Sequence, residues 1–291
     1  MRSAIPIVAG IFAGVATSAV FAVQVPKVEF LFTPVSGMPS LVVNSGSVGA
    51  AADGTLGGNA ALASGGPFGA GDYLLLDGAG DFVAVPNAFN YGGAATVEAW
   101  IRPDAVDGQR VIWDDYGNPG VLMTVFNGTL QWNISTTSNP GPGIGYLVGT
   151  ISTGVWHHVA GTYDGAFIRA YIDGALVGCA ATSGPIQDNG FPPKIGSDNI
   201  VTNALNFLGG IDDLRIFDVA LAPSELAGGY FATHPPKAGD LDGSGTVDGG
   251  DLGLLLSAWG PCPAPACCLA DLNGDGVVDG SDLGVLLASW Q

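Results

Sequence analysis

The sequence predicts a mainly β protein, built as an antiparallel sandwich or barrel, with a small helical module at its C-terminus. Three observations lead to this fold class. Short segments between residues 23 and 231 alternate apolar and polar side chains, which is the period of a strand. Asp-Gly and Asn-Gly pairs separate several of them and favour tight hairpins, whose turn residues need positive φ. Apart from a short helical turn at 223–227, helical periodicity begins only after residue 240.

Residues 1–22 are predicted to be a secretory signal peptide. Arg2 supplies a positive charge, residues 5–21 are apolar and small, and Val20-Phe21-Ala22 forms a small-x-small cleavage site. A membrane anchor is the alternative, but the apolar run is short and contains proline. We therefore expect a secreted or cell-surface protein with no membrane span after signal cleavage.

The strands predicted in the middle of the chain are the clearest. In TVEAWIRP (96–103), Val97, Ala99 and Ile101 are expected on one face and the residues between them on the other. Hairpin turns are expected at Asn127-Gly128, Asp164-Gly165 and Asp173-Gly174. Many short strands joined by such turns are typical of a sandwich or barrel.

Four blocks in this region resemble the laminin-G-like jelly-roll domains of the concanavalin A-like lectin/glucanase superfamily. They are YLLLDGAGDFVAVP (73–86), ATVEAWIRPD (95–104), VWHHVAGTYDGAFIRAYIDGALVG (155–178) and FLGGIDDLRIFDVALAPSEL (207–226). The resemblance implies a domain over residues 23–231 made of two curved antiparallel sheets packed face to face. It also implies a Ca²⁺ site near the first loop and the last strand, with Asn44, Asp53 and Asp212 as candidates. The alternative is that Asp53 only forms a turn and Asp212 is solvated.

Glucanases of this superfamily need two carboxylates on one strand face, one to donate a proton and one to attack or activate water. Glu98 has Trp100 and Arg102 at i+2 and i+4, so it lacks such a partner. His157 and His158 are adjacent and should point to opposite faces of a strand. We therefore expect no catalytic residue and no enzyme activity. The tryptophans of the domain are expected in the core, although they could stack on sugars: Trp100, Trp113, Trp132 and Trp156.

The overall charge excludes ordinary nucleic-acid binding. The chain has 26 acidic and 8 basic residues, a net charge of −18, whereas phosphate binding needs Lys and Arg. An acidic surface favours cations.

The four cysteines fit an oxidising compartment. We expect Cys262 to pair with Cys268 or Cys267. Whether Cys179 pairs with the remaining cysteine stays open. Zinc is the alternative, disfavoured because no histidine lies near.

Two stretches, GDLDGSGTVDGGDLGLLLSAWG (239–260) and ADLNGDGVVDGSDLGVLLASW (270–290), repeat one pattern. Positions 1, 3, 5, 9 and 12 of a calcium loop carry side chains with oxygen, glycine stands at position 6, and a backbone carbonyl is expected at position 7. A solvated acidic tail is the alternative. The expected ligands of two Ca²⁺ ions are Asp240, Asp242, Ser244, Thr246, Asp248 and Asp251, then Asp271, Asn273, Asp275, Val277, Asp279 and Asp282.

One helix is expected after each loop, because leucines and a tryptophan follow at i, i+3, i+4 and i+7. A duplicated loop and helix without a preceding helix resembles type I dockerin. The resemblance implies a module over residues 240–291, joined by a linker at 232–239, that binds a cohesin-like partner. Its partner-reading positions would be Gly249, Gly250, Gly280 and Ser281. Internal docking onto the sandwich is the alternative.

Together these features predict an exported, non-catalytic protein. The jelly-roll domain would bind a glycan or another protein, and the tail would attach it, with calcium, to a cohesin-like or cell-surface protein. Two alternatives stay open: a component of polysaccharide degradation with glycoside hydrolase activity, and a purely structural surface or matrix protein. Without calcium, the carboxylates crowded into the loops should leave the tail largely unfolded.

Overall fold

A computed structural model describes residues 24–86, 89–116, 120–187, 190–198, 205–262 and 267–291. The predicted signal peptide, residues 1–22, lies outside the described residues. No helix within the described ranges is long and apolar enough to cross a bilayer.

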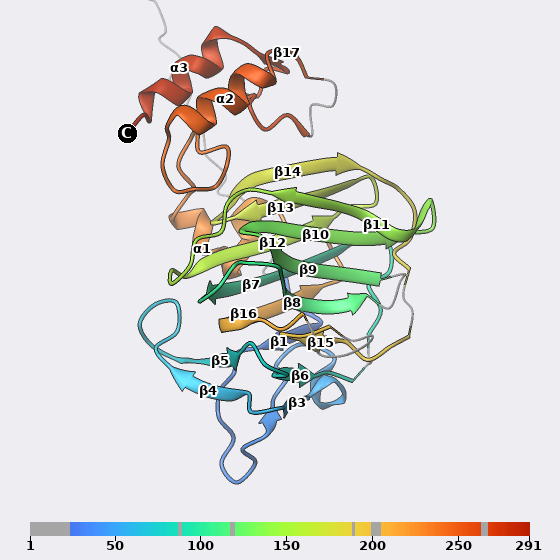
Figure 1. The fold of residues 1–291 in the computed structure, drawn as a ribbon. Coiled ribbons are helices and arrows are strands. Elements are labelled where there is room, and N and C mark those ends of the chain that lie inside the picture. The colour runs from blue at the N-terminus through green and yellow to red at the C-terminus, as the bar shows by residue number, and fades with distance from the viewer. Residues whose placement is uncertain (1–23, 87–88, 117–119, 188–189, 199–204, 263–266) are drawn as a thin grey trace, which may run out of the picture.

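Two antiparallel sheets pack face to face, as predicted (Figure 1). The first sheet has the order β14-β13-β12-β7-β16-β5-β4, and β1 also pairs with β16. Its strands are β1 (Val28–Phe30), β4 (Ala61–Ser64), β5 (Asp72–Asp77), β7 (Ala95–Pro103), β12 (His157–Tyr163), β13 (Phe167–Ile172), β14 (Ala175–Ala181) and β16 (Leu208–Phe217).

The second sheet has the order β11-β10-β9-β8-β15-β6-β3-β2. Its strands are β2 (Leu41–Val42), β3 (Gly54–Gly57), β6 (Phe82–Ala84), β8 (Gln109–Tyr116), β9 (Gly120–Phe126), β10 (Thr129–Thr136), β11 (Asn139–Val148) and β15 (Lys194–Ile195). A 3₁₀ turn, η1 (Gly49–Ala52), precedes β3.

All three predicted hairpins form, because the strands on either side of each turn pair antiparallel. Asn127 and Gly128 both have positive φ, as do Asp173 and Gly174, so these two turns match the right-handed twist of their strands. Apolar residues at alternate positions then meet between the sheets in one core. The fully buried Trp113 and Trp132 lie in this core, so neither indole is available to a sugar.

The outer face of the first sheet is covered as well, which the sequence does not indicate. After β16 the chain forms η2 (Pro223–Glu225) and α1 (Leu226–Thr233), and residues 227–229 inside α1 have positive φ. Leu226 and Phe231 pack on Trp100 in a second apolar cluster. Trp100 is therefore core, in agreement with the prediction, whereas Trp156 is half-buried.

The tail, residues 240–291, forms two loop-and-helix units that lie beside β13 and β14 (Figure 1). The helices are α2 (Gly249–Ser257) and α3 (Gly280–Ala288), and a short ladder joins β17 (Gly260–Pro261) to β18 (Val277–Val278). Leu255 and Leu286 are fully buried in a small tail core. The leucine-tryptophan stripes are only half covered, because Trp259 is 50% exposed and Trp290 is 42% exposed.

Candidate functional site

The first tail loop is organised by two aspartates that accept backbone hydrogen bonds. The carboxylate of Asp240 accepts the N–H groups of Ser244 at 3.0 Å and Gly245 at 2.8 Å. The fully buried Asp251 accepts the N–H groups of Leu241 at 2.7 Å and Asp248 at 2.8 Å. The residues at positions 1 and 12 therefore fold the loop around a shared centre.

The second loop repeats this geometry with its own residues. Asp271 accepts the N–H of Gly276 at 2.8 Å. The fully buried Asp282 accepts the N–H groups of Leu272 and Asp279, each at 2.8 Å. The two repeats thus agree in three dimensions as well as in sequence.

The donor set suits a hard cation. In the first loop, carboxylate oxygens of Asp240, Asp242 and Asp251 all lie within 4.8 Å of one another. Burial raises the pKa of Asp240 to about 6, and the nearby carboxylates of Asp251 and Asp242 add to this effect. Gly245 has a φ of +83°, which gives the sharp turn that position 6 requires. Carboxylate oxygens converging in this way are the ligands that Ca²⁺ prefers.

The remaining predicted ligands surround the same loops. The Ser244 hydroxyl donates to the Thr246 carbonyl at 3.3 Å. Asp248 and Asp279 each cap the helix that follows, accepting from Gly250 at 2.8 Å and Ser281 at 2.7 Å. In the second loop, Asp275 accepts from Asn273 at 3.0 Å and from the N–H of Val277 at 2.9 Å. The predicted partner-reading residues at positions 10 and 11 are exposed: Gly249, Gly250, Gly280 and Ser281.

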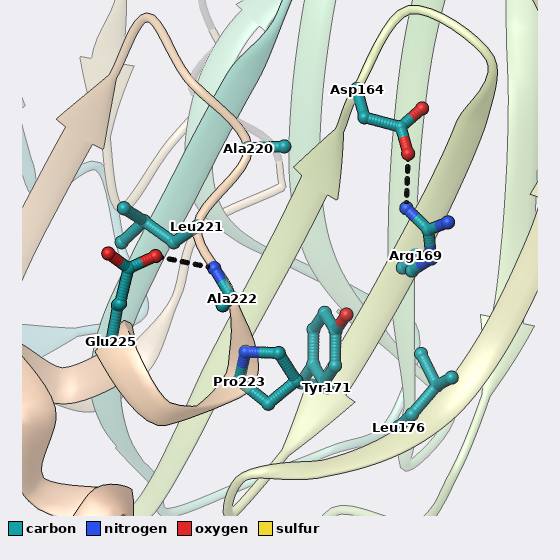
Figure 2. A pocket seen from close by; sticks show the side chains of 9 residues that line it. All are labelled: Asp164, Arg169, Tyr171, Leu176, Ala220, Leu221, Ala222, Pro223 and Glu225. Carbon is teal, nitrogen blue, oxygen red and sulfur yellow. Dashed lines mark hydrogen bonds and ion pairs between the residues drawn. The ribbon is translucent and has the colours of Figure 1, made fainter. Parts of the chain in front are cut away.

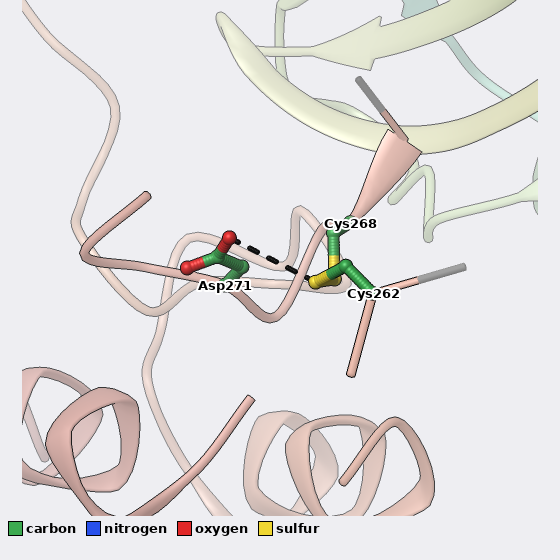
Figure 3. A group of neighbouring side chains, drawn as sticks. All are labelled: Cys262, Cys268 and Asp271. Carbon is green, nitrogen blue, oxygen red and sulfur yellow. Dashed lines mark hydrogen bonds between the residues drawn. A yellow bond between two sulfur atoms is a disulfide. The ribbon is translucent and has the colours of Figure 1, made fainter. Parts of the chain in front are cut away.

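All four cysteines form disulfides, Cys262 with Cys268 and Cys179 with Cys267. The zinc alternative is therefore wrong for this state, because a disulfide sulfur offers no thiolate. Figure 3 shows Cys262 and Cys268 beside Asp271, whose carboxylate oxygen lies 3.8 Å from the Cys262 sulfur. The second bridge joins the tail to β14 of the sandwich.

The three candidates for a calcium site in the sandwich are not all in contact. Asn44 and Asp53 meet, since the Asn44 N–H donates to the Asp53 carboxylate at 2.8 Å. The Asn44 side chain holds the loop together, accepting the N–H groups of Glu29 and Gly46. Asp212 accepts the N–H of Asp213 at 2.8 Å. Burial raises the pKa of Asp212 to about 7, and the Asp213 carboxylate contributes to the rise.

Glu98 is fully buried beneath α1 in a charged cluster. Its carboxylate lies 3.4 Å from both His158 and Arg215 and accepts the Ala227 N–H at 2.9 Å. Burial alone would raise the pKa of Glu98, but the hydrogen bond from His158 and the charges of His158 and Arg215 lower it overall. The contacts of this carboxylate therefore join β7, β12, β16 and α1.

His157 points away from His158, as predicted, and makes a contact that the sequence does not reveal. Its Nδ1 lies 2.8 Å from Asp173 Oδ2, and its Nε2 lies 2.7 Å from Ser152 Oγ. Ser152 is exposed, whereas His157 is buried. Ser152 belongs to no nucleophile motif. Only its position five residues before His157, beside the Asp173 turn, could have suggested that these three side chains lie together.

A pocket of about 470 Å³ opens on the outer face of the first sheet (Figure 2). Arg169 and Tyr171 come from β13, and the segment from Leu221 to Glu225 forms the facing wall. Arg169 donates to Asp164 at 2.7 Å, which fixes the guanidinium at the rim. Apolar walls with a few fixed polar groups are typical of small-ligand sites.

A comparison with protein-family models identifies the family of the sandwich. The family model described as the concanavalin A-like lectin/glucanases superfamily matches residues 77–227. No curated protein sequence is significantly similar to the chain.

Several solved structures have a similar fold. The binding domain of Paraclostridial Mosquitocidal Protein 1 is 15% identical with a TM-score of 0.57, over 75% of this chain and 55% of that one. The ligand binding domain of botulinum neurotoxin serotype D, in complex with N-acetylneuraminic acid, is 17% identical with a TM-score of 0.54, over 75% and 53%. The chain spans about half the length of these toxin domains.

Domain 4 of AbnA, a GH43 extracellular arabinanase from Geobacillus stearothermophilus, in complex with arabinotriose, is 22% identical with a TM-score of 0.52. The match covers 69% of this chain and 95% of that one. At these identities the similarity establishes the fold alone.

Proposed function

Since the chain belongs to the concanavalin A-like lectin/glucanases superfamily, we propose that it is an exported, non-catalytic recognition protein with a calcium-binding tail. The observation that carries the proposal is the duplicated loop, in which Asp240 and Asp251, and again Asp271 and Asp282, gather backbone amides around one centre. Extracellular calcium is high enough to fill even weak sites of this type.

Each ion would be held by the residues at positions 1, 3, 5, 7, 9 and 12 of its loop. Calcium would neutralise the crowded carboxylates and stabilise the tail. The tail would then bind a cohesin-like or cell-surface partner through the exposed positions Gly249, Gly250, Gly280 and Ser281. A thermal melt of the full chain tests this step: calcium should raise the melting temperature and EDTA should lower it, whereas magnesium at the same concentration should do little.

The sandwich would recognise a glycan in the pocket between β13 and residues 221–225. Arg169 and Asp164 form a fixed donor and acceptor pair that can meet neighbouring sugar hydroxyls, and Tyr171 and Leu176 give apolar contact. Two similar domains are complexed with sugars, N-acetylneuraminic acid and arabinotriose. The two carboxylates at the rim, Asp164 and Glu225, favour a neutral sugar over an acidic one.

A glycan array with calcium present tests the recognition step. Binding to neutral saccharides that is lost in Arg169→Ala and kept in Arg110→Ala would support the pocket, because Arg110 pairs with Asp107 and not with a pocket residue. A blank array would favour the structural alternative.

A second candidate function is ester hydrolysis at Ser152, favoured by the contact of Ser152 with His157, whose other ring nitrogen contacts Asp173. In this reaction Ser152 Oγ would add to an ester carbonyl while His157 Nε2 takes its proton and returns it to the departing alkoxide. Water would then hydrolyse the acyl-serine. A fluorophosphonate probe that labels the wild-type chain but not Ser152→Ala would establish this activity, and an unlabelled wild-type chain would exclude it.

A further inference from the structure

The two calcium loops have the same internal geometry but different surroundings. At position 4 of each loop stands a glycine with positive φ, +71° for Gly243 and +76° for Gly274. Gly243 is buried and Gly274 is exposed. A Cβ on Gly274 would have nothing within 4 Å, whereas one on Gly243 would lie 2.9 Å from Val177 Cγ1 and 3.2 Å from Ile172 Cβ.

The surface that covers Gly243 is part of the sandwich core. Ile172 is fully buried and Val177 is 6% exposed, and both belong to the inter-sheet cluster. The first loop also comes close to Gly149, the residue before Thr150. A Cβ on Gly149 would lie 3.1 Å from the Asp242 carbonyl oxygen. Two glycines thus let the first loop close over the end of the core.

A hydrogen bond ties this contact to the expected calcium ligands. The Thr150 N–H donates to the carbonyl of Asp242 at 3.1 Å, and the Asp242 side chain occupies position 3 of the loop. The disulfide between Cys179 and Cys267 holds the tail at the same strand, β14. Folding the first loop around an ion would therefore also fix the carbonyl and the glycine that contact the sandwich.

We propose that the first calcium loop is an intramolecular docking site for the end of β13–β14, and that its ion, but not that of the second loop, couples the tail to the sandwich. This inference rests on the proposed calcium function of the tail. Coupling between calcium binding and docking is reciprocal, so docking also increases the affinity of the first loop for calcium. We expect an increase of roughly tenfold, which lies within the range usual for coupled binding sites. The second loop and α3 remain available to an external partner.

The test uses the full chain with Cys179→Ser and Cys267→Ser, so that only non-covalent contacts hold the tail. Small-angle scattering should give a compact particle in calcium and a larger radius of gyration in EDTA. In calcium, Asp240→Asn should give the larger radius, whereas the equivalent change in the second loop, Asp271→Asn, should stay compact. A radius that ignores calcium, or is equal in these two variants, would overturn the proposal.

A second pair of variants separates docking from loss of the ion. Gly243→Ala and Gly274→Ala place the same strain on equivalent positive-φ positions, but only Gly243→Ala meets the sandwich. Gly243→Ala alone should enlarge the radius in calcium, and equal behaviour of the pair would again overturn the proposal. If calorimetry shows no calcium binding to the chain, the proposed function fails together with this inference. Two bound ions without the loop asymmetry would refute the inference alone.

Discussion

Replacing Gly161 by alanine tests the packing between the two sheets most sharply. Gly161 lies on β12 in the first sheet, and the indole of Trp132 on β10 in the second sheet covers it. An added Cβ would lie 2.7 Å from Trp132 Cε3 and closer still to Cδ2. The backbone of Gly161 is not in the positive-φ region, so the clash is the only expected cost.

The magnitude follows from the rigidity of this contact. Adding a methyl group to a packed core costs about 1–3 kcal/mol, and the fully buried indole has little room to move, which places the change near 3 kcal/mol. Gly93→Ala is the matched control, because a Cβ there has nothing within 4 Å and its effect should be within about 0.5 kcal/mol. Urea unfolding followed by circular dichroism measures both free energies.

A double-mutant cycle identifies the partner. The smaller ring in Trp132→Phe makes room for the methyl group added in Gly161→Ala. The loss of unfolding free energy in the double variant should therefore be smaller than the sum of the two single losses, by about 1–2 kcal/mol. Trp132→Phe should also leave any glycan binding unchanged. A cost below about 0.5 kcal/mol for Gly161→Ala, or an additive cycle, would refute this description of the core.

Three further changes test other parts of the structure. Glu98→Gln should lower the free energy of unfolding by about 2–3 kcal/mol at pH 7. Folding lowers the pKa of Glu98 from 4.5, so the ionised carboxylate stabilises the fold above that pH. As the pH falls through the folded pKa, the difference in stability between Glu98→Gln and wild type should vanish. Acid titrations of both proteins measure this. Cys179→Ser with Cys267→Ser should cost about 4–5 kcal/mol in chemical denaturation, since this bridge closes a separation of 88 residues; no change would mean that the tail is independent of the sandwich. Gly209→Ala should lower the yield of folded protein, because φ is +130° and a Cβ would collide with the Arg102 carbonyl; a wild-type melting temperature would contradict this close approach of β16 to β7.

The parts of the fold that depend on local chemistry were predictable. Asp-Gly and Asn-Gly turns need only their own φ values, and the pairs at residues 127–128 and 173–174 form the expected hairpins. The hydrogen bonds of the first tail loop are local as well, because Asp240 and Asp251 accept backbone N–H groups within one short segment. The alternation in β7 also placed Val97, Ala99 and Ile101 in the core.

Contacts between distant segments could not be read from these patterns. Glu98 alternates onto the outer face of its strand, yet it is buried because α1 folds back over that face. The bridge from Cys179 to Cys267 depends on where the tail docks, which no local spacing encodes. The Ser152–His157 contact likewise forms only when the loop before β12 meets the Asp173 turn.

We propose that the tail binds calcium through its two loops. Calorimetric titration of the full chain with calcium measures this directly, and we expect two ions for the wild type. Asp251→Ala and Asp282→Ala should each remove one ion, and the double variant should bind none. Absence of heat with the wild type, or two ions still bound by the double variant, would contradict the account.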